Sequence, residues 1–194
     1  MGKKINLQRK KNLQINEKWH MYIKRGFFII LIMVAALLQN TPHLLPSIYG
    51  ARPFLLIPVV VCISIFEKNI STAFFGLFAG VLWDTAMAVG DGFNTLVLML
   101  ISAVSGVLLY YLMRNNMVTA LLLTSGSLLF YCVLHWLIFL LFRGIQGSAI
   151  MFLTFYLPSM LYSILFMPVI YFGIRAFNKK LRDTRPVTQK INRL

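Results

Sequence analysis

The stretch from Ile70 to Leu96, ISTAFFGLFAGVLWDTAMAVGDGFNTL, decides how the rest of the chain can fold. The run from Ser71 to Gly90 within it is apolar over a membrane-spanning length and includes one acid, Asp84. Because Gly76, Gly80 and Asp84 are spaced four apart, they share one face of a helix with 3.6 residues per turn. A GxxxG pair lets another helix approach closely, and an acid deep in lipid must be satisfied by protein or water. This face is therefore predicted to look inward, toward another helix or a cavity.

The composition of the 194-residue chain is that of an integral membrane protein. Hydrophobic residues make up 59% of it and charged residues 12%, and its mean hydropathy is +0.76. A soluble all-helical core does not fit, because several uncharged apolar stretches reach about 20 residues, the length that crosses ~30 Å of hydrocarbon. None of these stretches shows the alternation of polar and apolar residues found in barrel strands. The sequence predicts an all-α integral membrane protein.

Six transmembrane helices are predicted from the apolar stretches, which lie near residues 26–40, 48–66, 71–90, 93–113, 117–142 and 149–177. The chain then divides into a basic cytoplasmic tail at 1–24, a six-helix transmembrane domain at 25–177 and a second basic cytoplasmic tail at 178–194. Residues 1–20 contain too few apolar side chains to bury a core, so we expect a mobile tail there.

Prolines and small residues predict the shape and pairing of individual spans. Pro53 and Pro58 leave the second span with a short apolar core, which predicts a kinked or partly interfacial helix. The sixth span also contains two prolines and should bend. In the fourth span, Ser102 and Gly106 are four apart and form a face of small residues. That face is a candidate surface for the third span.

The net charge of +14 is concentrated at the two ends of the chain. Eight basic residues lie between Lys3 and Arg25, and seven lie between Arg175 and Arg193. Cytoplasmic loops of membrane proteins carry an excess of Lys and Arg, so both termini are predicted to be cytoplasmic. Nucleic acid is not an expected partner, because basic residues beside spans orient the protein and bind anionic lipids. The candidates for that role are Lys24, Arg25, Arg114, Arg175, Lys179 and Lys180.

Asp84 is the strongest candidate for a structural or functional role. A carboxylate at a helix centre costs about 2.5–3.5 kcal/mol on insertion scales, so the fold must compensate for it. At 1.5 Å per residue, Asp84 lies roughly 21 Å from the cytoplasmic edge, and His135 on the fifth span lies at comparable depth. We expect His135, or hydroxyls of the facing spans, to satisfy Asp84 and fix the packing of the third span. Two alternatives stay open: Asp84 binds a ligand, proton or partner, and the glycine stripe docks another protein's spanning helix.

Catalytic and metal-binding patterns are missing from the sequence. It contains no Walker loop, HExxH, GxSxG or dinucleotide fingerprint. Cys62 and Cys132 fall inside predicted spans and lack metal-site spacing. Glu67 and Asp91 lie at span ends and are interpreted as solvated turn residues. We expect no enzyme activity, no metal and no cofactor.

The motif in the opening stretch reads Gly76-x-x-x-Gly80-x-x-x-Asp84, followed by Gly90 and then by Gly92-Phe93-Asn94-Thr95-Leu96. Across residues 75–96 it resembles the signature of the bacterial rod shape-determining protein family MreD. The size of the chain, its helical spans and its basic ends are also similar to that family.

This resemblance implies a non-enzymatic, multi-pass protein of the bacterial plasma membrane that belongs to the cell-elongation machinery and maintains rod shape. The implied partners are MreC, the actin-like MreB filament, RodA and a class B penicillin-binding protein. The motif implies packing or partner-docking roles for Gly76, Gly80, Asp84 and Gly92. His135 is added as a candidate for the same role because it lies at a depth similar to that of Asp84.

The family's fold is similar to the six-helix substrate-binding subunits of energy-coupling-factor vitamin transporters, so the resemblance also implies a competing function. A chain of this size with a polar residue in the outer half of its spans could itself bind a vitamin. The short loop at 40–52 and the few polar groups in the outer half favour the scaffold instead.

Overall fold

The computed structural model describes residues 2–41, 44, 46, 50–67, 71–87, 91–111, 116–144 and 147–183, with side chains described from Trp19 to Leu181. Helices make up 88% of it, and the described residues form no strand. The elements in chain order are α1 (Gly2–Asn40), α2 (Leu56–Phe66), α3 (Ser71–Ala86), α4 (Phe93–Tyr111), α5 (Met117–Trp136), the π-helix η1 (Leu137–Leu141), α6 (Ser148–Met151), the π-helix η2 (Phe152–Tyr156) and α7 (Leu157–Asp183). The prediction of an all-α protein is confirmed.

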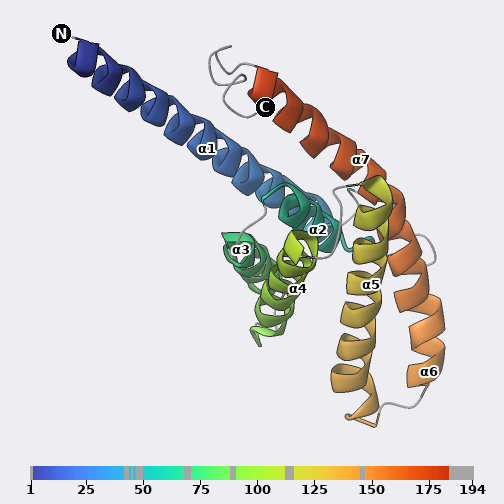
Figure 1. Cartoon of the computed structure of the whole chain (residues 1–194). Helices are drawn as coiled ribbons and strands as arrows, with labels where there is room; N and C mark the ends of the chain where they lie inside the picture. Colours follow the sequence, from blue (N-terminus) through green and yellow to red (C-terminus); the bar gives the residue numbers. More distant parts are fainter. Residues whose placement is uncertain are drawn as a thin grey trace.

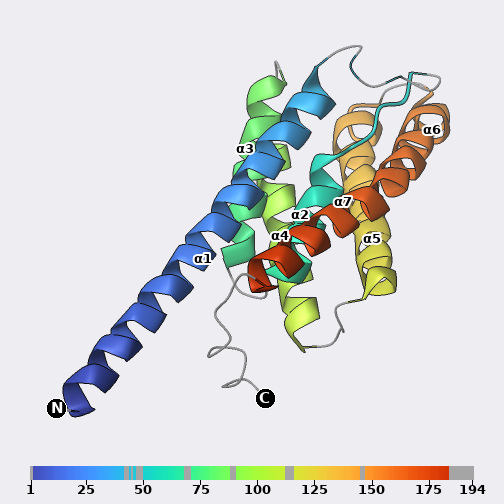
Figure 2. The same cartoon turned by 90° about the horizontal axis from the view of Figure 1, so that it is seen from above.

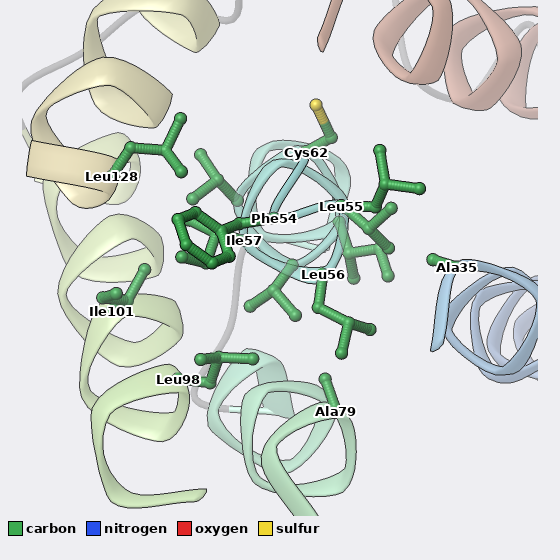
Figure 3. Close-up of a cluster of buried hydrophobic side chains, with 14 of the residues drawn as sticks. Ala35, Phe54, Leu55, Leu56, Ile57, Cys62, Ala79, Leu98, Ile101 and Leu128 are labelled. Atoms are coloured by element: carbon green, nitrogen blue, oxygen red, sulfur yellow. The ribbon is translucent and has the colours of Figure 1, made fainter. Parts of the chain in front are cut away.

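The short helix α2 lies at the centre of the bundle. All its residues from Leu56 to Ile65 are buried, as expected for a helix that is apolar on every side. Figure 3 looks along α2 and shows side chains of the surrounding helices directed at it: Ala35 from α1, Ala79 from α3, Leu98 and Ile101 from α4, and Leu128 from α5. The apolar residues of α2 that could face lipid are therefore enclosed by protein, and the kinked or partly interfacial helix expected near residues 48–66 stays a prediction.

Two backbone N–H groups at the start of α2 and in the irregular segment before it are satisfied by side chains of two other helices. The Phe54 N–H donates to Oγ of Ser163 on α7 at 2.7 Å, and the Leu56 N–H donates to Oε1 of Gln39 on α1 at 3.0 Å. Irregular backbone is tolerated at membrane depth only where protein or a cavity provides such partners. These two bonds allow the chain to start a helix inside the bundle.

The other helices surround α2 in two groups. α3 packs along α4, while α5 lies beside α6 and α7 (Figures 1 and 2). α1 contacts α2 and α3 and extends well beyond the bundle at its N-terminal end (Figure 2). Where a mobile tail was expected at residues 1–20, the backbone from Gly2 onward is helical and continuous with the membrane segment.

Among the residues that the structure describes, four helices are long and apolar enough to cross a membrane: Trp19–Asn40, Phe93–Tyr111, Met117–Leu141 and Ser148–Leu181. They make the chain a membrane protein. The remaining two predicted spans correspond to α2 and α3, which have 11 and 16 helical residues and would extend about 16 Å and 24 Å.

The last span is interrupted close to one of its prolines. η2 ends at Tyr156, and Pro158 follows two residues later in α7. A proline ring crowds the carbonyl four residues earlier, here that of Thr154 inside η2, and a wider π turn relieves this crowding. Pro168 lies inside α7, which continues through it.

Candidate functional site

Asp84, at the end of α3, caps the start of α4. Its side chain is 7% exposed. Oδ1 accepts the N–H of Asn94 at 3.2 Å, and Oδ2 accepts the N–H of Thr95 at 2.8 Å and the Thr95 hydroxyl at 2.5 Å. The first N–H groups of a helix have no partner within it, and the positive end of the helix dipole favours a carboxylate. Asp84 thus satisfies α4 from a different helix.

Gly92 explains why the cap comes from outside α4. Its carbonyl accepts the N–H of Leu96 at 3.1 Å, so Gly92 occupies the N-cap position of α4, but glycine has no side chain with which to cap. Its φ of +70° lies in the left-handed region that favours glycine. The turn before α4 therefore favours glycine, which has no side chain to cap the helix. The carboxylate oxygen atoms of Asp84 accept the N–H groups that an N-cap side chain would otherwise satisfy.

The glycine stripe of α3 lies against the backbone of α4. A Cβ placed on Gly76 would stand 2.6 Å from Cβ of Ser102, and one placed on Gly80 would stand 2.8 Å from the carbonyl oxygen of Asn94. In return, a Cβ on Gly106 of α4 would meet Oγ1 of Thr72 at 2.6 Å. The predicted pairing of the small faces of the third and fourth spans is confirmed, and this contact occupies the stripe within the chain.

Hydroxyl groups join the same pair of helices to α2. The Ser102 hydroxyl donates to the carbonyl oxygen of Thr72 at 2.5 Å, and Oγ of Ser64 on α2 lies 3.2 Å from Oγ of Ser102. All three residues are buried. Such interhelical hydrogen bonds stabilise helix packing where water is absent.

His135 does not bond Asp84; its described hydrogen-bond partner is the Tyr156 hydroxyl, 2.7 Å from Nδ1. Its ring also stacks on Phe139 with the centroids 4.6 Å apart. A buried residue of α5, Tyr131, is instead the one that reaches the Asp84 region, because its hydroxyl donates to Oδ1 of Asn94 at 2.7 Å. The expectation that His135 satisfies Asp84 is wrong, since equal depth does not bring two side chains to the same side of a bundle.

At the other end of the bundle, Glu67 holds α1 to the end of α2. Its carboxylate lies 2.5 Å from Nζ of Lys24 and 3.5 Å from Nε of Arg25, and its side chain is only 12% exposed. Lys24 also donates to the carbonyl oxygen of Phe66 at 2.7 Å. The interpretation of Glu67 as a solvated residue is wrong, and two residues predicted to orient the protein have a packing role as well.

The other predicted lipid-facing cations are exposed or lie outside the description. Arg175, Lys179 and Lys180 are exposed on α7, and Arg114 falls outside the described residues. Their contact with lipid stays a prediction.

A groove of about 420 Å³ separates α4 from α5 on the surface of the bundle. Leu100 and Val104 line it on α4, and Leu122 and Phe130 line it on α5. Its lining includes Gly126, where an added Cβ would meet nothing within 4 Å. The groove is therefore largely apolar, and at Gly126 the backbone of another helix could approach α5 closely.

Three residues of the hydrogen-bonded group around Asp84 were not predicted from the sequence as site residues: Asn94, Thr95 and Tyr131. Asn94 and Thr95 lie in the quoted motif, and polar residues directly after a glycine at the start of an apolar run signal a helix N-terminus. Tyr131 carries no such signal. Within the described residues, no three His, Cys, Asp or Glu side chains come close enough to hold a metal ion.

A family model described as rod shape-determining protein MreD matches residues 21–181. The chain matches no curated protein and no solved structure.

Proposed function

Because this chain belongs to the MreD family of rod shape-determining proteins, we propose that it is a non-enzymatic scaffold of the cell-elongation complex, which docks MreC and the peptidoglycan synthesis machinery. The family gives it a role in determining rod shape, and the family is one of structural membrane proteins rather than a known enzyme family. MreB, RodA and a class B penicillin-binding protein are further proposed partners.

The proposed location is the bacterial plasma membrane, crossed six times with both termini in the cytoplasm. Four of the described helices have the length to cross it, and the proposal assigns the other two passes to α2 and α3. α2 is extended at its start by the buried residues from Pro53 to Leu55, which adds to its reach. The basic residues at both ends of the chain support this orientation.

The groove between α4 and α5 is the proposed docking site for the spanning helix of MreC. The glycine stripe is excluded from this role because α4 covers it. In the groove, by contrast, Gly126 faces open space, and the flanking side chains of Leu122 and Phe130 are 58% and 42% exposed. Small residues on an otherwise apolar face allow two spanning helices to approach closely. The exposed apolar groove with Gly126 in its lining is the observation that supports MreC docking most directly.

Gly126→Leu tests the groove, with Gly173→Leu as its matched control. Both glycines lie in helices, and a Cβ added at either position meets no atom within 4 Å, so the two substitutions start from equally open sites. Only Gly126 lines the groove. The expected result is that Gly126→Leu lowers the amount of MreC that copurifies by about tenfold, which corresponds to about 1.4 kcal/mol, while Gly173→Leu does not.

The cellular part of the test is depletion of the protein, with cell width followed by microscopy. Cells should round up, and wild type and Gly173→Leu should restore rods while Gly126→Leu should not. Equal MreC copurification and equal rescue by both variants would contradict docking in the groove.

The runner-up is a substrate-binding subunit of an energy-coupling-factor vitamin transporter. The observation that favours it is a partly polar pocket lined by residues of α1, α3 and the segment before α2. Normal rods with impaired vitamin uptake after depletion would support this function and contradict the scaffold.

A further inference from the structure

A second concavity lies where α1 and α3 end and α2 begins. It has a volume of about 470 Å³, within the range of about 300–1,000 Å³ typical of small-molecule sites. Its lining residues come from α1, from the segment before α2 and from α3. They include Gln39, Asn40, Arg52, Phe54 and Trp83. Figure 2 shows these three segments converging at one end of the bundle.

Two residues that line this pocket carry buried side-chain N–H groups without hydrogen-bond partners. Oε1 of Gln39 accepts the N–H of Leu56, which fixes the other end of the amide as a donor, and its Nε2 is shielded from solvent and unpaired. Nε1 of Trp83 is also shielded and unpaired, in a side chain that is only 1% exposed. Most buried polar groups have a partner, so two unpaired donors at one pocket require an explanation.

The charge around the pocket has one sign. Arg52 lies exposed at its rim, and among the described residues no acid lines it. The neighbouring carboxylate of Asp84 is directed at α4 and already accepts three donors there. The N-terminal end of α2 begins two residues after Phe54 and adds the positive end of a helix dipole. Discontinuous helices in membrane proteins direct such ends at anionic groups.

The pocket also has an apolar part. The rings of Phe54 and Trp83 lie 5.7 Å apart, and Phe155 packs on Phe54 at 6.5 Å. A ligand that fits must therefore combine a negatively charged acceptor group with an apolar portion. Polar and charged groups would fix its orientation, and the aromatic rings would bury the rest.

We propose that this pocket binds the anionic head of a phosphate-bearing amphiphile, with Arg52 as its ion-pair partner and the N–H of Trp83 as a buried donor. The same phosphate chemistry occurs in an anionic lipid and in a soluble phosphate. The inference does not rest on the docking of MreC.

Calorimetric titration of the purified full-length protein in a neutral detergent tests the proposal. The probes are short-chain phosphatidylglycerol, short-chain phosphatidylcholine as the matched lipid without net charge, and inorganic phosphate. Binding of phosphatidylglycerol but not of inorganic phosphate identifies a lipid head group, and binding of both identifies a site open to soluble anions. Equal binding of the two lipids, or no binding of either anion, would overturn the proposal.

Three variants locate the site. Arg52→Gln should weaken phosphatidylglycerol binding by about tenfold or more, the loss expected for one charge-assisted contact. Trp83→Phe keeps an aromatic ring, removes the donor and should weaken binding severalfold. Arg143→Gln is the control, because Arg143 is also exposed but lies outside the pocket, near the ring of Phe139. An unchanged affinity in Arg52→Gln or Trp83→Phe, or an equal loss in Arg143→Gln, rejects the assignment.

Discussion

The carboxylate of Asp84 receives three donors from α4, two of which are backbone N–H groups that Gly92 cannot satisfy. The sequence predicted that an acid at this depth must be compensated, and the expectation that a facing hydroxyl would do so is confirmed by Thr95. The sequence could not select between Thr95 and His135, because spacing along a helix gives depth but not the rotation or order of neighbouring helices. Whether Asp84 also serves a ligand or partner stays a prediction.

Asp84→Ala should lower the free energy of unfolding by about 2–3 kcal/mol, because it leaves buried N–H groups unpaired and removes a helix cap. Asp84→Asn keeps one acceptor oxygen and should cost less. The measurement is the thermal midpoint of the purified protein in detergent. Asp91→Asn is the control, since Asp91 is an exposed acid in the same turn and should leave the midpoint unchanged. If all three variants melt like wild type, the capping role is wrong.

At the level of elements, α3 and α4 form one closely packed pair. The four-residue spacing of Gly76 and Gly80 predicted a helix-packing face, and Ser102 and Gly106 predicted the face opposite it. Both predictions came from side-chain size alone, which determines how closely two backbones can approach. The turn between the helices depends on Gly92, whose positive φ no spacing pattern reveals.

Gly80→Ala should separate this pair. The new methyl would overlap Cα of Thr95 in the α4 backbone, which has no rotamer with which to move away, so we expect a loss of about 3 kcal/mol or more. Gly173→Ala on α7 is the matched control, because its Cβ meets nothing and a helical Gly→Ala change is favourable by up to about 1 kcal/mol. The yield and thermal midpoint of the two purified proteins provide the comparison. Similar midpoints for Gly80→Ala and Gly173→Ala would contradict the close contact.

The junction of α1 and α2 should respond to Glu67→Gln. Lys24 and Glu67 are 21% and 12% exposed, so removal of the carboxylate leaves a largely buried ammonium group without its counter-charge. The expected loss is about 1–2 kcal/mol, between the values for exposed and fully buried ion pairs. Denaturation in detergent measures it, and Lys24→Met in the Glu67→Gln background should recover part of the loss. No recovery would show that the ion pair is not what joins the two helices.

For the whole molecule, the sequence predicted the all-α membrane class and helices in all six apolar segments, but not which of them lies in the middle. Residues Leu56 to Ile65 are apolar whether they face lipid or protein, and only the neighbours of α2 decide between the two. The sequence also could not predict how the backbone N–H groups at the start of α2 are satisfied, because their acceptors, Gln39 and Ser163, lie far from α2 in the sequence. The few apolar residues of the basic tail predicted a mobile segment, whereas α1 continues through it.

The cap shared between α3 and α4 has a consequence for the way the chain enters the membrane. As α3 leaves the translocon alone, it carries a carboxylate without partners, and α4 alone would present bare N–H groups to lipid. The carboxylate of Asp84 and the N–H groups at the start of α4 satisfy each other once the two helices pack together. With both helices crossing the membrane as proposed, we therefore expect the two segments to insert together as a hairpin.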